Sequence, residues 1–258
     1  MRRLRTRSTA PDAEQLATIH TPDAVRRRLG AERRPSVLGD AVLGAVDGAV
    51  TTFAVVAGVT GAQLADGIVV VMGTANLLAD GFSMAIGNYL GTRAELQQRD
   101  RARRDEEHQI ETFPDGEREE VRQILAGQGF AGEQLDDAVR VVTGDREVWL
   151  DLMMREELGY SADPPRPVAA ALSTFAAFLL VGLLPLGAYI VDLAWPDQIA
   201  DPFVWSAVLT LSAFFAVGVA KAGLVGRRRW SSGLETLAVG GSAAVLAYAV
   251  GVLLRGVA

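Results

Sequence analysis

Long apolar stretches alternate with polar segments along this chain of 258 residues. About 20 apolar residues in a helix suffice to cross a bilayer, so each stretch longer than that is predicted to be a membrane-spanning helix. A water-soluble protein spreads charge over its whole surface, whereas these stretches are almost free of charge. Five such stretches are present, at about residues 37–61, 67–90, 167–193, 203–225 and 233–255.

The segment between the second and third stretches, residues 91–166, is predicted to be the one water-soluble part of the chain. It carries 19 acids and 11 arginines, a net charge of −8. Helical patterns run from the end of the second stretch to about residue 111, then over about 115–127, then over about 132–158. Proline and glycine residues mark the two breaks. We expect a domain of three helices, the first continuous with the second membrane span.

The first 36 residues hold nine arginines and four acids and lack a sustained apolar face. They are predicted to form a mostly mobile basic arm, with a short amphipathic helix around residues 12–19 as an option. Beside a membrane span such an arm either stays solvated, which the composition favours, or contacts anionic lipid. Contact with lipid gains about 1 kcal/mol for each arginine near the surface.

The distribution of basic residues predicts the orientation in the membrane, because cytoplasmic connections carry an excess of Lys and Arg. The arm and residues 91–166 are rich in arginine, whereas the connections 62–66 and 194–202 contain no Lys or Arg. We therefore expect the N-terminus and residues 91–166 to be cytoplasmic and the C-terminus to lie outside. Arg255, at the very end of the fifth stretch, is the exception.

The composition excludes several classes of site. The chain has no cysteine and only two histidines, which excludes disulfides, iron–sulfur clusters and thiolate zinc sites. Its net charge of −6 argues against nucleic acid as a partner. No nucleophile and base are grouped as an enzyme requires, and no prosthetic group is expected. The arginine- and alanine-rich composition, without an organelle signal, favours a bacterial inner membrane.

Ionisable residues inside the predicted spans are candidates for a transport pathway, because such residues are expensive in lipid. Asp47 lies near the middle of the first span, and Asp80 lies well inside the second. The alternative is that each carboxylate caps a broken helix or pairs with an arginine, but neither span contains an arginine. Residues four apart share a helix face, which adds further members to each stripe. In the second span these are Asn76, Met84 and Asn88, and in the first they are Asp40, Gly44 and Thr51.

The pairing of carboxylates with Met84 bears on the choice of ion. Carboxylate oxygens suit Mg, Ca and Mn, whereas a thioether is a soft ligand from which hard ions gain little. The combination therefore favours a divalent transition metal, of which Fe²⁺ is the abundant candidate. Alternatively, Met84 is a flexible packing residue, as most methionines are.

Residues 91–166 repeat the combination of carboxylates and thioethers. Glu117 and Glu120 are three apart on one helix, and Met153, Met154 and Glu157 lie within one turn of another. A further acidic group, Glu106, Glu107 and Glu111, belongs to the first helix. Acidic runs on helices are usually solvated and often pair with arginines, and this interpretation stays open beside metal binding.

Several segments together resemble the vacuolar iron transporter family. Each is short and unspecific alone, but they occur in order over residues 36–255. They are 47–59 (DGAVTTFAVVAGV), 76–90 (NLLADGFSMAIGNYL), 149–159 (WLDLMMREELG), 185–189 (PLGAY) and 233–241 (GLETLAVGG).

The resemblance implies an all-α membrane protein with five transmembrane helices, a three-helix cytoplasmic metal-binding domain inserted between the second and third, and a homodimer. It implies export of Fe²⁺, and in some members Mn²⁺, from the cytosol in exchange for protons. The family's pathway residues match Asp47 and Met84. Its cytoplasmic metal ligands match Glu106, Glu117, Glu120, Met153, Met154 and Glu157.

The chain departs from the family pattern at three positions. A glutamate expected one turn after Glu106 is Gln109, and carboxylates of some members are Asn76 and Asn88. An amide cannot accept a proton as a carboxylate does, so Asp47 and Asp80 are the remaining candidates for carrying the coupled proton. Glu111 or His108 is a candidate substitute for Gln109.

From these observations we expect a proton-coupled exporter of Fe²⁺ or Mn²⁺ whose acidic cytoplasmic domain collects the ion. Two alternatives stay open: a membrane-anchored metal sensor or scaffold, and a transporter of another cation. The expected partners are metal ions, protons, the lipid bilayer and a second copy of the chain.

Overall fold

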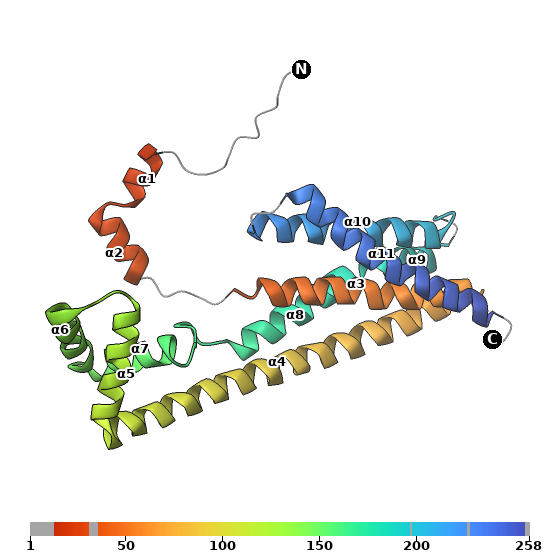
Figure 1. Ribbon diagram of the computed structural model, residues 1–258. Helices are drawn as coiled ribbons and strands as arrows, with labels where there is room; N and C mark the ends of the chain where they lie inside the picture. Colours follow the sequence, from red (N-terminus) through yellow and green to blue (C-terminus); the bar gives the residue numbers. More distant parts are fainter. Residues whose placement is uncertain (1–12, 31–35, 197, 226–227, 256–258) are drawn as a thin grey trace. The chain divides into compact units, whose positions relative to one another are not determined.

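The computed structural model describes residues 13–30, 36–196, 198–225 and 228–255, and all regular structure in these ranges is helical. The chain divides into two units, Met1–Arg34 and Pro35–Ala258. The helices are labelled in Figure 1. In chain order they are α1 (Ala13–Ile19), α2 (Pro22–Gly30), α3 (Leu38–Gly61), α4 (Asp66–Thr112), α5 (Pro114–Gly127), α6 (Gly132–Thr143), α7 (Arg146–Glu156), α8 (Pro167–Gly182), α9 (Leu184–Ala194), α10 (Pro202–Val225) and α11 (Arg229–Leu254).

The first unit contains α1 and α2, two short helices in contact with each other. The helix expected around residues 12–19 is present as α1. A second helix, α2 over Pro22–Gly30, was not expected from the sequence. The missed signal is local: Thr21 precedes the helix, and its hydroxyl accepts a hydrogen bond from the Ala24 amide at 3.4 Å.

Four helices of the second unit, α3, α4, α10 and α11, are each long and apolar enough to cross a membrane. The stretch predicted as a span over 167–193 is broken into α8 and α9, which meet at 49° and make a fifth span if counted together. Pro185 explains the break, because its nitrogen cannot donate the hydrogen bond that would continue the helix. The Pro185 carbonyl also accepts a hydrogen bond from the buried Ser206 hydroxyl of α10 at 2.6 Å.

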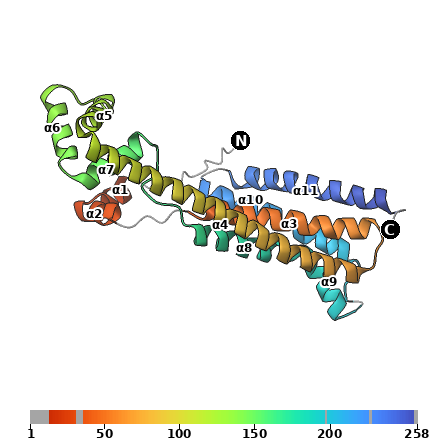
Figure 2. The same ribbon diagram turned by 90° about the horizontal axis from the view of Figure 1, so that it is seen from below.

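Helix α3 is the centre of the membrane bundle and contacts α4, α8, α9, α10 and α11. Figure 2 shows it between α11 on one side and α4 and α8 on the other. Its approach to α8 is close because of two glycines: a Cβ atom would lie 3.0 Å from the Thr174 Cα at Gly44 and 2.9 Å from the Phe178 Cα at Gly48. Small residues at such positions let membrane helices pack tightly.

The expected continuity of the second span with the cytoplasmic segment is confirmed. Helix α4 runs without interruption for 47 residues, a length of about 70 Å. Its first part packs on α3 and α8, and its last part packs on α5 and α7. One rigid element therefore links the membrane bundle to the polar domain, as both views show.

The polar domain has its own core, formed by α5, α6, α7 and the end of α4. Val121, Trp149, Leu150 and Met153 are buried in it. The single helix predicted over 132–158 is wrong, because it is divided at Gly144 into α6 and α7. The Asp145 side chain starts α7 by accepting hydrogen bonds from the amides of Glu147 and Val148, at 3.0 and 3.2 Å.

Arg255, the one basic residue that disagreed with the predicted orientation, has a structural role at the end of α11. The Nε of Arg255 donates a hydrogen bond to the carbonyl oxygen of Gly61 at 3.1 Å. Gly61 is the last residue of α3, whose terminal carbonyls lack partners within the helix. Arg255 therefore caps a neighbouring helix, whose C-terminal end favours a positive charge.

Candidate metal sites

Two predicted ligands of the polar domain, Glu106 and Glu117, are buried side by side. Glu106 of α4 is 1% exposed and Glu117 of α5 is 5% exposed, and their carboxyl groups share a hydrogen bond. One further oxygen of each carboxyl group is buried without a hydrogen-bond partner. Unpaired buried oxygen atoms are costly, and they are the atoms a cation would contact.

Burial is also the main influence on the protonation of this pair. It raises the pKa of Glu106 to about 8, and the neighbouring carboxylates of Glu117, Glu157 and Glu120 add to the rise. Burial likewise raises the pKa of Glu117, while the hydrogen bond with Glu106 opposes that rise. At neutral pH the pair therefore holds a proton, which a metal ion would have to displace.

Two other predicted ligands, Glu120 and Glu157, are exposed at the rim of this pair. Burial, the Glu120 carboxylate and the Glu117 carboxylate raise the pKa of Glu157, and its side chain is hydrogen-bonded to Glu120. In the part of the chain that the structure describes, no three His, Cys, Asp or Glu side chains are already arranged as a metal-binding group. The four glutamates are thus electrostatically coupled, but they do not form a closed coordination shell.

The two predicted thioether ligands, Met153 and Met154, are buried in α7, 0% and 3% exposed. Both pack in the hydrophobic core of the domain together with Val121 and Leu150. Packing accounts for the burial of both side chains. The same core contains residues of α4 and α5, the helices that carry Glu106 and Glu117.

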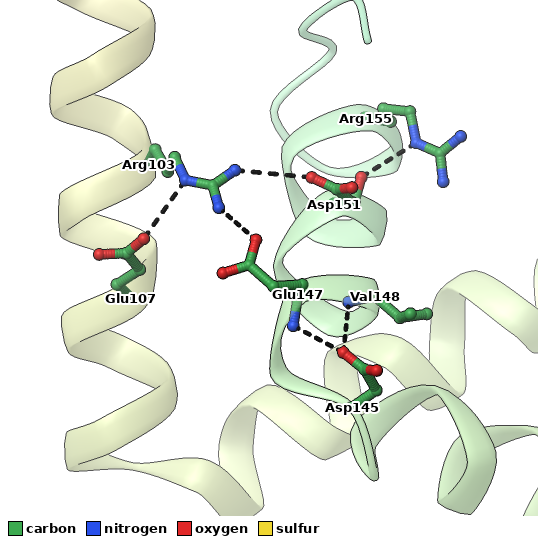
Figure 3. Close-up of polar contacts among 7 residues, drawn as sticks. All are labelled: Arg103, Glu107, Asp145, Glu147, Val148, Asp151 and Arg155. Carbon is green, nitrogen blue, oxygen red and sulfur yellow. Dashed lines mark hydrogen bonds and ion pairs between the residues drawn. The ribbon is translucent and has the colours of Figure 1, made fainter. Parts of the chain in front are cut away.

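Other acids of the domain have arginine partners instead (Figure 3). Arg103 of α4 donates to Glu147 at 2.6 Å and lies 3.3 Å from Glu107 and 3.5 Å from Asp151, joining α4 to α7. No ion pair among the described residues involves any of the four coupled glutamates. The alternative that acidic runs pair with arginines therefore holds for these neighbours. Further pairs of this kind link Arg118 to Asp115 and Arg122 to Asp136 and Glu119.

Neither candidate substitute for Gln109 joins the coupled glutamates. Glu111 is paired with Arg146, and the His108 ring lies 3.5 Å from the Thr112 hydroxyl on the exposed side of α4. Gln109 itself is exposed. The coupled group therefore has one carboxylate fewer than the family pattern implies.

Within the membrane bundle, the half-buried carboxylates of Asp47 on α3 and Asp80 on α4 lie near enough to repel each other when both are ionised. No hydrogen bond to the Asp47 carboxylate is found among the described residues. Met84 packs against the core of the bundle, and the Asn76 side-chain nitrogen is buried without a partner. Two acids and an unpaired amide therefore occupy the region where α3 and α4 meet.

The remaining predicted pathway residues, Asp40 and Asn88, form a polar network at one end of the bundle. The Asn88 amide nitrogen donates to Asp40 at 2.8 Å and to the Thr174 hydroxyl at 2.7 Å. The Thr92 hydroxyl donates to the Asn88 oxygen at 3.2 Å. The amide of Asn88 is thus fully engaged in holding α3, α4 and α8 together.

The sequence analysis missed two residues of the bundle. Thr174 is fully buried and connects Asp40 with Asn88; a hydroxyl inside an apolar stretch was the available signal. Asp192 near the end of α9 has a buried carboxylate oxygen without a partner, and as an acid within a predicted span it met the criterion applied to Asp47.

Comparison with known proteins agrees with this arrangement. The model of the VIT family matches residues 38–252. The chain is 33% identical over 213 residues to vacuolar iron transporter 1 of Arabidopsis thaliana, covering 82% of this chain and 84% of that protein. It is also 33% identical over 256 residues to the vacuolar iron transporter of Toxoplasma gondii, covering 95% and 85%. These relatives are named transporters, which supports the expectation of a protein that is not an enzyme. The resemblance inferred from the motifs is confirmed: the chain belongs to the VIT family.

Proposed function

We propose that this protein exports a divalent transition metal, Fe²⁺ or Mn²⁺, from the cytosol in exchange for protons. The observation that carries the proposal is the buried pair Glu106 and Glu117, which forms no ion pair with any described residue, in a chain whose relatives are named iron transporters. Two carboxyl groups with unpaired buried oxygens attract a cation, and thioethers nearby favour a transition metal over Mg²⁺ or Ca²⁺.

In this proposal the polar domain collects the ion. The net charge of −8 over residues 91–166 raises the local concentration of cations. Glu106 and Glu117 supply the buried oxygens, Glu120 and Glu157 close over the ion from the rim, and Met153 and Met154 supply sulfur. Binding releases the proton that the buried pair holds at neutral pH.

Helix α4 sets the distance over which the ion then travels. Glu106 and Met84 are 22 residues apart on one uninterrupted helix, so they lie about 33 Å from each other. One ion cannot contact both sites at that distance, so it leaves the polar domain before it enters the bundle.

Inside the membrane, we assign coordination of the ion to Asp47 and Met84, contributed by both subunits of a homodimer. Protons from the outer side compete for the carboxylates of Asp47 and Asp80 and release the metal there. A protonated carboxyl group loses its charge and with it most of its attraction for the cation.

The proposed location is the bacterial inner membrane, with the N-terminus and residues 91–166 in the cytoplasm and the C-terminus outside. The arginine distribution of the connections supports this orientation. In such a membrane, export of Fe²⁺ serves detoxification rather than storage.

The test is Fe²⁺ uptake into sealed proteoliposomes with and without a pH gradient. We expect uptake driven by the gradient in the native protein and none in Asp47→Ala. Asp66→Asn is the matched control, because Asp66 is an exposed acid at the outer end of α4. Metal binding without flux in the native protein would support a sensor or scaffold instead, and normal flux in Asp47→Ala would reject the pathway.

A further inference from the structure

Helices α1 and α2 leave their large apolar side chains uncovered. Leu16, Ile19 and Leu29 are 39%, 46% and 68% exposed, and α2 has no buried residue. Helices as short as these are marginal in water unless an apolar face is packed against something. These two helices therefore need a surface beyond their own contact to cover their apolar side chains.

The residues of α2 are arranged as in helices that lie in a membrane surface. Val25 and Leu29 are four residues apart and share a face. At 100° per residue, Arg26 and Arg28 lie about 80° to either side of that face, and Arg27 lies opposite it. Arginines at the borders of an apolar stripe can bury their stems beside it while their charged ends reach phosphate groups.

The positive charge of residues 1–34 favours a negatively charged surface. Residues 1–34 carry nine arginines and four acids, a net charge of +5. Such a segment is attracted to anionic phospholipids and not to neutral ones. In α2 the one acid, Asp23, sits in the first turn and the arginines sit toward the last, which also complements the helix dipole.

The chain itself keeps these helices near a bilayer. Gly30 ends α2 and Leu38 begins α3, a candidate membrane span. The seven residues between them reach at most about 25 Å when fully extended. A lipid surface is therefore always within reach of α2, which raises its effective concentration at the membrane.

We propose that α1 and α2 form a surface anchor that binds anionic phospholipid through Arg26 and Arg28 and inserts Leu16, Ile19 and Leu29 among the headgroups. This proposal is independent of the transported ion. It is also independent of orientation in a nanodisc, because both of its faces have the same lipids.

The experiment uses the full chain, whose lack of cysteine allows one spin label at a chosen site. A nitroxide is attached through Leu29→Cys, and its accessibility to oxygen and to a water-soluble nickel chelate is measured in nanodiscs. One set of discs contains phosphatidylcholine alone, and the other also contains phosphatidylglycerol. We expect the label to shift from the aqueous phase into the bilayer only in the anionic discs.

Two controls separate lipid binding from general protection. A label at Asp23→Cys, on the opposite side of α2, stays accessible to the chelate in both lipids. Combining Leu29→Cys with Arg26→Gln and Arg28→Gln abolishes the shift, whereas the corresponding lysine variants retain it. Protection of the Leu29 label in both lipids would indicate a protein contact and would overturn the proposal. A shift that persists after the glutamine substitutions would also overturn it, and so would the absence of any shift in anionic discs.

Discussion

The membrane bundle and the polar domain place their carboxylates in opposite surroundings. In the domain, acids such as Glu107, Glu147 and Asp151 are held by Arg103. Among the described residues of the bundle no arginine forms an ion pair with an acid, and Asp40 is instead held by the neutral amide of Asn88. A carboxylate bound to an arginine is neutralised and serves the fold, whereas one without a cation keeps its attraction for a positive ion.

The buried pair in the domain, Glu106 and Glu117, therefore resembles the bundle more than its own neighbours. In both regions the acids at the candidate metal sites lack an arginine partner among the described residues. In the domain these acids are buried, and in the bundle they lie on helices predicted to span the membrane. The two regions differ in how their helices are held together: both have a hydrophobic core, to which the domain adds ion pairs and the bundle adds close approach of backbones at glycines.

The largest effect is expected from removing that close approach. Gly48→Ala places a methyl group 2.9 Å from the Phe178 Cα, so α3 and α8 must separate. We expect a loss of about 1–3 kcal/mol in the stability of the bundle, measured as the melting of the purified protein in detergent. Gly58→Ala is the control, because its Cβ meets nothing within 4 Å. Equal melting of the two variants would show that the glycine contact does not hold the bundle.

The role of the thioether in the bundle is tested with two methionines of α4. Met84→Leu keeps the volume but removes the sulfur, so we expect folding to persist and Fe²⁺ flux to fall by about tenfold or more, the factor produced by about 1.4 kcal/mol of lost binding. Met72→Leu is the control, since Met72 is exposed on the same helix. Unchanged flux in Met84→Leu would assign that residue to packing.

The raised pKa of Glu106 predicts the pH dependence of metal binding in the domain. Below pH 8 a metal ion competes with a bound proton, so the apparent affinity for Fe²⁺ falls by about tenfold for each pH unit if one proton is displaced. Anaerobic titration calorimetry of the native chain measures this slope. Glu107→Gln should keep it and Glu106→Gln should flatten it; the same slope in both would place the titrating group elsewhere.

The same pKa gives the sign of the effect on stability. The pKa of Glu106 lies above its ordinary value of 4.5. Its protonated form therefore contributes stability fully below about pH 4.5, and the contribution is lost as the pH rises through about 8. We expect Glu106→Gln to reduce the loss of domain stability between these values, followed by hydrogen exchange of α5 and α7 amides. An unchanged pH profile would contradict the assignment.

The smallest effect is expected from the arginine junction of Figure 3. Arg103→Ala removes contacts with three carboxylates, but these groups are partly exposed, so about 1 kcal/mol of stability is lost. Local hydrogen exchange of α7 measures the loss. Arg101→Ala, whose single ion pair is highly exposed, should change stability by less than about 0.5 kcal/mol. Equal effects of the two variants would show that the ion pairs of Arg103 do not stabilise the domain.

Features that depend on neighbouring residues along the chain could be predicted well. The length of the uncharged apolar stretches located α3, α4, α10 and α11, and the helical pattern that follows the second stretch indicated that α4 continues beyond it. Two breaks were missed although their signals were local, at Pro185 and at Gly144 followed by Asp145. The stretch around Pro185 is apolar throughout, and the helical periodicity continues across Gly144, so neither break was evident from the pattern.

The sequence by itself determined which segments are apolar enough for the membrane, where the acids and methionines occur and to which family the chain belongs. Only the tertiary structure separated acids that pair with arginine from those that do not, because that depends on which helices pack together. Glu106 and Glu107 are adjacent in sequence, yet one faces the buried Glu117 and the other faces Arg103. Their side chains point about 100° apart on α4, and packing against different neighbours gives them different chemistry.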